Sequence, residues 1–231
     1  MVNQGQANIG TNHMKWQLKR LIVMLLACCC LSCGGGGGHE TSAGGASSAS
    51  SPDPVVVIVN DVPDTVINGR IVWSESRLEQ YLSVMQAQLT SDFRAAWNIT
   101  ARLQVGGAGD YVLRFRSGNG PDNGDHGNDD NGSPEANVYV DNCIASGNDP
   151  LLVAEHEVLE MLVDPHADGK EIVDPVVCWT YCEGQTIQPG QLECPEGSAI
   201  VPDFVFPAYF SGGAGPYDFM HLMTRPHGSC P

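Results

Sequence analysis

Basic side chains are scarce in this chain of 231 residues, which contains 11 Lys and Arg against 27 Asp and Glu. Three of the basic residues (Lys15, Lys19 and Arg20) precede Cys33, whereas every acidic residue follows it. A nucleic-acid partner requires basic side chains that neutralise phosphates, so we expect none. The acidic surplus favours cationic substrates or divalent ions, although it also serves solubility alone.

The sequence also lacks several features that define large classes of proteins. No segment reaches the roughly 20 apolar residues that a membrane-spanning helix needs. There is no glycine-rich phosphate loop followed by Lys and Ser or Thr, and no Gly-x-Ser-x-Gly turn. These absences argue against an integral membrane protein, a nucleotide-dependent enzyme and a serine hydrolase.

Residues 1–33 have the pattern of an export signal, in which a basic stretch runs into a short apolar segment and then a cysteine cluster. The cluster resembles a bacterial lipobox, whose acylated cysteine becomes the mature N-terminus. Cys28 and Cys33 both fit, and we favour Cys33 as the lipidated residue because glycines follow it. An ordinary secretory signal is the alternative, and we expect translation to start at Met14. A lipid anchor would then be the protein's only membrane attachment, in the bacterial cell envelope.

Residues 34–54 are mainly Gly, Ser and Ala, which predicts a flexible tether. Residues 55–231 are long enough for one domain with its own core, and we expect no second one. Five cysteines lie in this part of the chain, and export permits disulfides. Because five is odd, at least one thiol stays free or pairs between molecules. Cys178 and Cys182 could alternatively belong to a metal knuckle, but no second pair with zinc-finger spacing accompanies them.

The order of the expected elements predicts an α+β fold. A β-branched strand at residues 55–59 precedes an amphipathic helix that starts at a capping box, Ser76 to Glu79, and continues to Trp97. Alternating patterns predict strands at residues 99–105 and 111–116, and residues 117–136 read as a solvated loop.

A further strand is expected at residues 137–141. After it, Asn148, Asp149 and Pro150 supply the cap and first turn of a helix that ends near Asp164. The remainder is loop-rich, with a short strand at residues 203–206.

The helix after Pro150 carries the residues with the clearest chemistry. His156 and Glu160 are four positions apart, so they lie on one face, one turn from each other, where both can bind one cation. Glu157 lies beside them and could accept a proton from a metal-bound water, which makes it the candidate general base. This is the arrangement of HExxH metallopeptidases, with the second histidine replaced by glutamate.

The replacement leaves the metal open. A His and Glu pair suits zinc, which we expect, but a shell richer in carboxylates also accepts manganese, iron or calcium. Charged residues on a solvated helix face would show the same spacing by chance. The strongly apolar neighbours argue against that reading, because they indicate a buried helix where unpaired charges are costly.

Several motifs in a shared order resemble a family of uncharacterised prokaryotic and phage proteins with a zincin-like metallopeptidase signature. The family has an HExxE helix ending in Asp-Pro, then a Glu-x-x-Asp-Pro segment, then an aromatic Asp-Phe-Val-x-Pro-Ala-Tyr-Phe stretch. Here these are residues 156–165, 171–175 and 203–210, and residues 90–97 resemble the end of the family's upstream helix. The resemblance covers residues 55–226.

The resemblance implies a zincin-like fold, in which a twisted mixed sheet packs on the amphipathic helix and on the reactive helix. Residues 137–141 would form the edge strand at the cleft, and a peptide or protein substrate would bind by adding a strand there. The third metal ligand would be Asp174 or Glu171, with the other supporting it. His166 is a rival at metzincin spacing, but Val163 replaces the glycine that those proteins use.

We therefore expect a metal-dependent hydrolase, acting on peptide bonds, with Glu157 as base and His156, Glu160 and Asp174 or Glu171 as ligands. The alternative is a non-catalytic zincin-like binding or envelope lipoprotein, whose acidic cluster serves structure or calcium binding.

Overall fold

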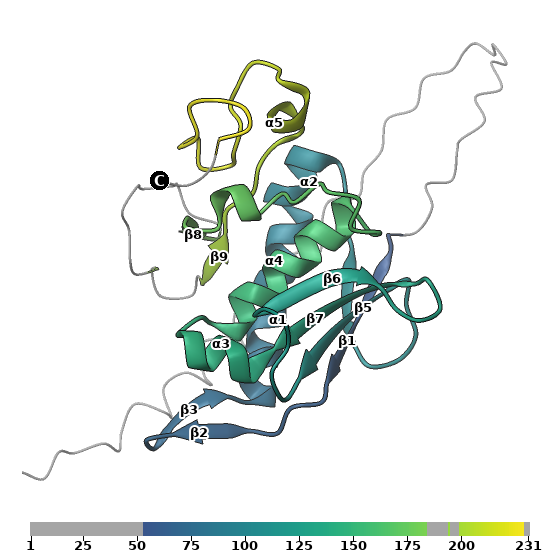
Figure 1. Ribbon diagram of the computed structural model, residues 1–231, viewed down its shortest axis with the longest axis vertical. Coiled ribbons are helices and arrows are strands. Elements are labelled where there is room, and N and C mark those ends of the chain that lie inside the picture. Colours follow the sequence, from purple (N-terminus) through teal and green to yellow (C-terminus); the bar gives the residue numbers. More distant parts are fainter. Residues whose placement is uncertain (1–52, 184–193, 195–198, 229–231) are drawn as a thin grey trace, which may run out of the picture. The chain divides into compact units, whose positions relative to one another are not determined.

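The β-branched run near the start of the folded region lies inside a five-stranded sheet (Figure 1). The computed structural model describes residues 53–183, 194 and 199–228, all within one compact unit. Strand β1 (Val55–Asn60) pairs in parallel with β4 (Arg102–Val105) on one side and with β5 (Tyr111–Arg116) on the other. The predicted first strand is confirmed.

The sheet is mixed because its last strand runs against the others. Its order is β4-β1-β5-β7-β6. Strand β7 (Pro134–Tyr139) is parallel to β5, whereas β6 (Gly124–Asn128) is antiparallel to β7 and forms the edge. Strands β4 and β5, which follow each other in sequence, both pair with β1 and not with each other.

Two sequence predictions fail in this part of the sheet. Residues 117–136 are not a loop throughout, because they contain β6 and the start of β7. The strand expected at residues 137–141 ends at Tyr139 and lies between β5 and β6, so it is not the edge. Helix α3 (Val140–Ser146) begins directly after it.

One face of the sheet is apolar and the other is polar, as strand β5 shows. Leu113 and Phe115 are fully buried, whereas the alternate residues Arg114 and Arg116 form ion pairs with Glu135 of β7. Side chains of successive strand residues point to opposite faces, so this alternation assigns each face its role. The helices therefore cover the apolar face and leave the other to solvent.

Helix α1 (Glu75–Thr90) supplies buried apolar residues to this face, but its ends differ from the prediction. Its N-cap is Ser74, whose hydroxyl accepts a hydrogen bond from the Arg77 amide, so the predicted capping box at Ser76 is wrong. The helix also stops before Trp97, and a separate helix α2 (Asp92–Trp97) follows Ser91. The helix breaks at Ser91, whose φ and ψ are −107° and −88° and whose amide and hydroxyl both donate to the Ala87 carbonyl, at 3.0 and 2.7 Å.

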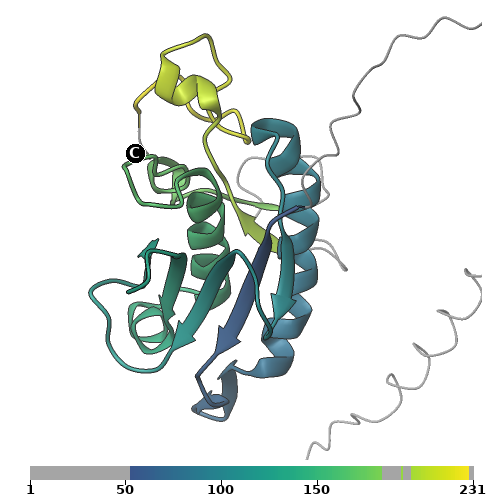
Figure 2. The ribbon, with the colours of Figure 1, turned by 90° about the vertical axis from the view of Figure 1, so that its right-hand side faces the viewer.

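Helix α4 (Pro150–Val163) crosses the sheet beside α1 and contacts β6, β7 and β9. It starts as predicted, because the Asp149 side chain accepts from the Leu151 amide and Pro150 occupies the first turn. It ends at Val163, with Asp164 as its C-cap before Pro165. Figure 2 shows the helices against the sheet from the side.

The remaining elements are short. Strands β2 (Thr65–Ile67) and β3 (Arg70–Trp73) form a hairpin before α1. After α4 come a 3-10 turn η1 (Asp174–Val176), the hairpin of β8 (Thr180–Cys182) and β9 (Ile200–Pro202), and α5 (Pro207–Ser211). The strand predicted at residues 203–206 is wrong, since only Val205 makes an isolated bridge, to Asp218.

The described cysteines confirm the expectation of a disulfide. Cys182 is bonded to Cys194, so Cys182 is not available for a metal knuckle, and Cys143 is free and buried. Among the described helices, none combines the length and the apolar character required to cross a bilayer. The predicted export signal, the lipidation at Cys33 and nearly all of the tether lie outside the described residues.

Candidate metal centre

Helix α4 has two faces, and the polar one lines a pocket of about 560 Å³. Its core side is formed by apolar residues that are almost completely buried: Leu151, Ala154, Val158, Leu159, Met161 and Leu162. On the pocket side the helix presents Asp149, Leu152, Val153, His156, Glu157 and Glu160. These positions recur at three- and four-residue steps, so the helical period alone brings His156, Glu157 and Glu160 to one opening.

The polypeptide returns to this pocket after the helix because of a turn that Asp164 organises. The Asp164 carboxylate accepts hydrogen bonds from the amides of Asp168 and Lys170 at 3.0 and 2.7 Å. The segment that follows is held by buried apolar side chains, Ile172, Val173 and Val176. Glu171 and Asp174 alternate with these anchors and reach the pocket wall.

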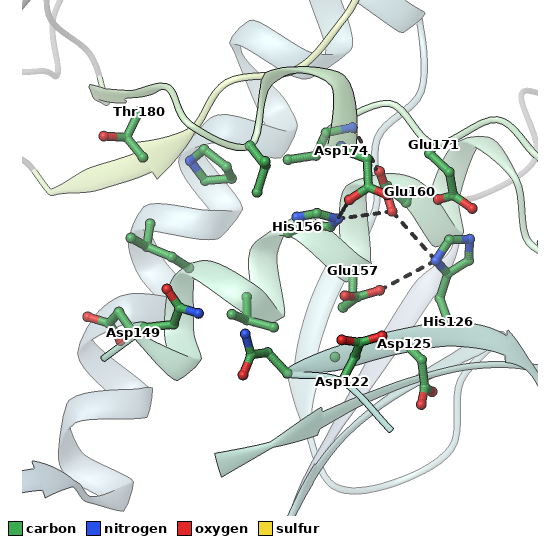
Figure 3. Close-up of a pocket in the computed structure, with 18 residues that line it drawn as sticks. Asp122, Asp125, His126, Asp149, His156, Glu157, Glu160, Glu171, Asp174 and Thr180 are labelled. Atoms are coloured by element: carbon green, nitrogen blue, oxygen red, sulfur yellow. Dashed lines mark hydrogen bonds and ion pairs between the residues drawn. The ribbon is translucent and has the colours of Figure 1, made fainter. Parts of the chain in front are cut away.

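The structure brings His156 and Glu160 together with Asp174, one of the two candidate third ligands (Figure 3). The Nε2 atom of His156 is 3.1 Å from Oε2 of Glu160 and 3.3 Å from Oδ1 of Asp174. The three potential ligand atoms lie within 4.8 Å of one another. One imidazole nitrogen and two carboxylate oxygens at such spacing could hold a divalent cation.

Glu160 is fixed in place by the returning segment. Its Oε1 atom accepts hydrogen bonds from the amides of Val173 and Asp174, at 2.8 and 3.2 Å. This leaves Oε2 facing His156, and the side chain is only 2% exposed. The backbone thus fixes the orientation of the carboxylate, as supporting hydrogen bonds do for metal ligands.

Glu157 lies in the same pocket, against the edge strand. Its Oε2 atom is 3.4 Å from Nδ1 of His126 on β6. A Cβ atom at Gly124 would lie 2.5 Å from Oε1 of Glu157 and 2.8 Å from Val153, so a glycine is required there for this approach. Gly124 and His126 share one face of β6 because they are two residues apart.

A second group of potential ligands overlaps the first. His126, Glu160 and Glu171 offer one ligand atom each within 4.8 Å of one another. Glu171 therefore lies closer to His126, whereas Asp174 lies closer to His156, and the two candidate third ligands occupy different places. His166 belongs to neither group, and its Nδ1 atom is 2.9 Å from Oδ1 of Asn128.

The protonation of the pocket follows from this crowding of acids around two imidazoles. Burial alone would lower the pKa of His156, but hydrogen bonds to Asp174 and Glu160 outweigh it and raise the pKa to about 10. Burial opposes the ionisation of Glu160, yet His156 lowers its pKa to about 2. Burial and the neighbouring Glu160 raise the pKa of Glu171 to about 7. Burial also raises the pKa of Glu157, against the effect of His126.

Glu155, the neighbour of His156 in sequence, points away from the pocket. It is fully buried, and its Oε2 atom is 2.5 Å from the hydroxyl of Tyr81 on α1. Burial raises the pKa of Glu155 to about 8, so this side chain is largely protonated at neutral pH. Two glutamates two positions apart on α4 therefore occupy different chemical environments.

His126 is the pocket residue that sequence reasoning missed. It stands in a polar segment whose glycines and aspartates predict a loop, and only pairing with β7 makes this segment a strand. Its side chain is 4% exposed, which is unusual for a histidine in a solvated loop. The sequence offered one signal of a special position for His126: Gly124 lies two residues before it and Gly127 directly after it.

No protein-family model matches this chain, and a comparison with curated proteins found no match. The resemblance to zincin-like proteins thus depends on the motifs quoted above.

Proposed function

We propose that this protein is a metal-dependent hydrolase that cleaves peptide bonds and is tethered to the bacterial cell envelope through Cys33. The observation that carries the proposal is the convergence of His156, Glu160 and Asp174 beside Glu157 in an open pocket. A divalent cation, zinc as the first choice, would increase the acidity of a bound water and polarise a carbonyl there.

Each residue of the pocket has a defined task in this proposal. His156, Glu160 and Asp174 hold the ion, and the amides of Val173 and Asp174 keep Glu160 oriented. Glu157 takes the proton from the attacking water, a role that suits a buried carboxylate whose pKa burial raises above its ordinary value. His126 contacts Glu157 and limits the directions in which it can turn.

The arrangement of sheet and helix supports a zincin-like fold for the proposed enzyme. The single antiparallel strand of the five-stranded sheet, β6, is one of its two edges, and it lies beside the helix that carries the HExxE motif. The outer backbone edge of β6 has no partner strand in that sheet, so an extended peptide could pair with it. The substrate-binding edge would therefore be β6, in place of residues 137–141.

A comparison of two glutamates on α4 tests the proposal. The zinc-loaded wild type, Glu157→Gln and Glu155→Gln would be incubated with a library of internally quenched peptides. We expect Glu157→Gln to lose about 10²- to 10⁴-fold in cleavage rate with its zinc content unchanged, because only proton transfer is removed. Glu155→Gln should match the wild type, since Glu155 contacts Tyr81 outside the pocket.

Two results would contradict the hydrolase. The first is the absence of stoichiometric metal at neutral pH in both the wild type and Glu157→Gln, which would show that the pocket is not a metal site. The second is an equal cleavage rate for Glu157→Gln and the wild type, which would show that Glu157 is not the general base. Stoichiometric metal without cleavage by the wild type would instead favour a zincin-like binding protein in the envelope.

A further inference from the structure

His126 has a buried ring nitrogen that no contact among the described residues uses. Its side chain is 4% exposed, and Nε2 has no hydrogen-bond partner among the described residues. The other nitrogen, Nδ1, is 3.4 Å from Oε2 of Glu157 and 3.7 Å from Oε2 of Glu160. A buried nitrogen of this kind is costly unless a ligand completes its contacts.

The surroundings of this nitrogen indicate which ligand fits. One ligand atom from each of His126, Glu160 and Glu171 lies within 4.8 Å of the other two. Figure 3 shows the His126 ring next to the Glu171 carboxylate, on the side away from the dashed contacts of Nδ1. An imidazole nitrogen with two carboxylates is a donor set that zinc and manganese accept.

Acids also outnumber cations beside His126. Of the seven Asp and Glu side chains that line the pocket, Asp149 pairs with Arg77 and Asp125 accepts hydrogen bonds from Asn137 and Tyr139, so the acids nearest His126 are Glu157, Glu160 and Glu171. An ion held by His156, Glu160 and Asp174 leaves Glu157 and Glu171 without a cationic partner other than His126. A second dication beside His126 would balance them, and Nδ1 would then donate to Glu157, as the free nitrogen of a ligating histidine commonly does.

Glu160 is placed to serve two ions. Its Oε1 atom is bound by backbone amides, while Oε2 lies 3.1 Å from Nε2 of His156 and 3.7 Å from Nδ1 of His126. Glu160 is also the residue that the two groups of potential ligands share. Carboxylates that bridge two metal ions about 3.5 to 4 Å apart occur in phosphatases and aminopeptidases, where the ions stabilise both the attacking and the leaving oxygens.

We propose that this pocket binds two divalent cations, the second held by His126, Glu160 and Glu171, with Glu160 shared between them. The proposal rests on the first ion position of the proposed function. It assigns Glu171 and Asp174 to different ions, although the sequence offered them as alternatives for one.

The test is a count of bound ions in purified full-length protein and four variants. Each is dialysed to equilibrium against Zn²⁺ and, separately, Mn²⁺, and the bound metal is measured by elemental analysis. We expect two ions per chain in the wild type, one in Glu171→Gln, one in Asp174→Asn and none in Glu160→Gln. His166→Ala is the matched histidine control and should retain two, because His166 contacts Asn128 outside both groups.

Two further measurements protect the count from simple artefacts. Circular dichroism checks that each variant is folded, and His126→Gln, which should also bind one ion, provides a second variant at the second position. The electron paramagnetic resonance spectrum of the Mn²⁺ protein should show two coupled spins in the wild type and an isolated spin in Glu171→Gln. Coupling distinguishes neighbouring ions from a distant surface ion.

The outcomes separate this proposal from the proposed function. One ion in the wild type that Glu171→Gln and His126→Gln retain would overturn the second position and leave the hydrolase intact. One ion that Glu171→Gln loses would also overturn the pair, because the single ion would then lie beside His126. No bound ion in the wild type would overturn both proposals, and two uncoupled Mn²⁺ ions would overturn the shared Glu160.

Discussion

The carboxylates Asp203 and Asp218 are as deeply buried as Glu157 and Glu160, yet the two pairs are built differently. Asp203 accepts hydrogen bonds from the amides of Phe204 and Met220, and Asp218 from those of Leu222 and Met223. Neither aspartate lines the described pocket. These hydrogen bonds join the loops of the C-terminal region to one another.

The α4 pocket combines its acids with histidines and an opening to solvent. The comparison shows that a buried acid is not in itself a sign of function. Backbone amides bind Oδ1 of Asp203 and both oxygens of Asp218, so only Oδ2 of Asp203 lacks a described partner, whereas the pocket keeps ligand atoms of several side chains directed at a shared space.

Replacing one acid in each pair separates metal binding from structure. We expect Glu160→Gln to weaken Zn²⁺ binding by about 100-fold or more, because a charged ligand is lost while the Gln oxygen still accepts from Val173. Asp203→Asn should bind Zn²⁺ as the wild type does. Competition with a chromophoric chelator measures both affinities. Equal affinities for the two variants would show that the pocket acid contributes no more to metal binding than the C-terminal one.

The buried aspartate pair makes stability depend on pH. Burial, followed by the charge of Asp218, raises the pKa of Asp203 to about 8. The folded protein therefore binds more protons than the unfolded chain between about pH 4 and 8, and stability decreases as pH rises through this window. We expect a loss of about 2 kcal/mol between about pH 6.5 and 8.5, measured by urea denaturation of chelator-treated protein.

Asp203→Asn provides the control for this dependence, since its amide does not titrate and its oxygen can still accept from Phe204. Its stability should change less with pH than that of the wild type. The same slope in both proteins would show that Asp203 is ionised in the folded state.

The contact between Tyr81 and Glu155 is a third buried arrangement, on the opposite side of α4 from the pocket. Tyr81→Phe should lower the free energy of unfolding by about 1.5 kcal/mol, because Glu155 then loses its hydrogen-bond partner. Metal affinity should not change. Thermal denaturation and chelator competition measure the two effects, and an altered affinity would mean that the two sides of α4 are coupled.

Two glycines of β6 test the close approach of Glu157. Gly124→Ala places a Cβ atom 2.5 Å from Oε1 of Glu157, so the side chain must move. We expect about a tenfold loss of cleavage rate, since a displaced base transfers protons less well, with metal binding retained. Gly127→Ala on the same strand meets nothing within 4 Å and should behave as the wild type. Equal losses of cleavage rate in the two variants would show that the effect comes from disturbing strand β6 and not from displacing Glu157.

Those parts of the fold that depend on local signals were predicted from the sequence. The β-branched run of β1 and the Asp149-Pro150 start of α4 act within a few residues, and helical spacing alone placed His156 beside Glu160. The order of strands in the sheet depends on distant pairing, so the edge position of β6 and the role of His126 were not predictable. For the same reason, the sequence could not assign Asp174 and Glu171 to different histidines.

The most direct test of the account is the position of zinc in a crystal of this protein grown with Zn²⁺. Anomalous scattering measured at the zinc absorption edge should give a peak about 2.0 to 2.2 Å from Nε2 of His156 and from oxygens of Glu160 and Asp174. Strong peaks only at other histidines or acids, with none between these three residues, would contradict it.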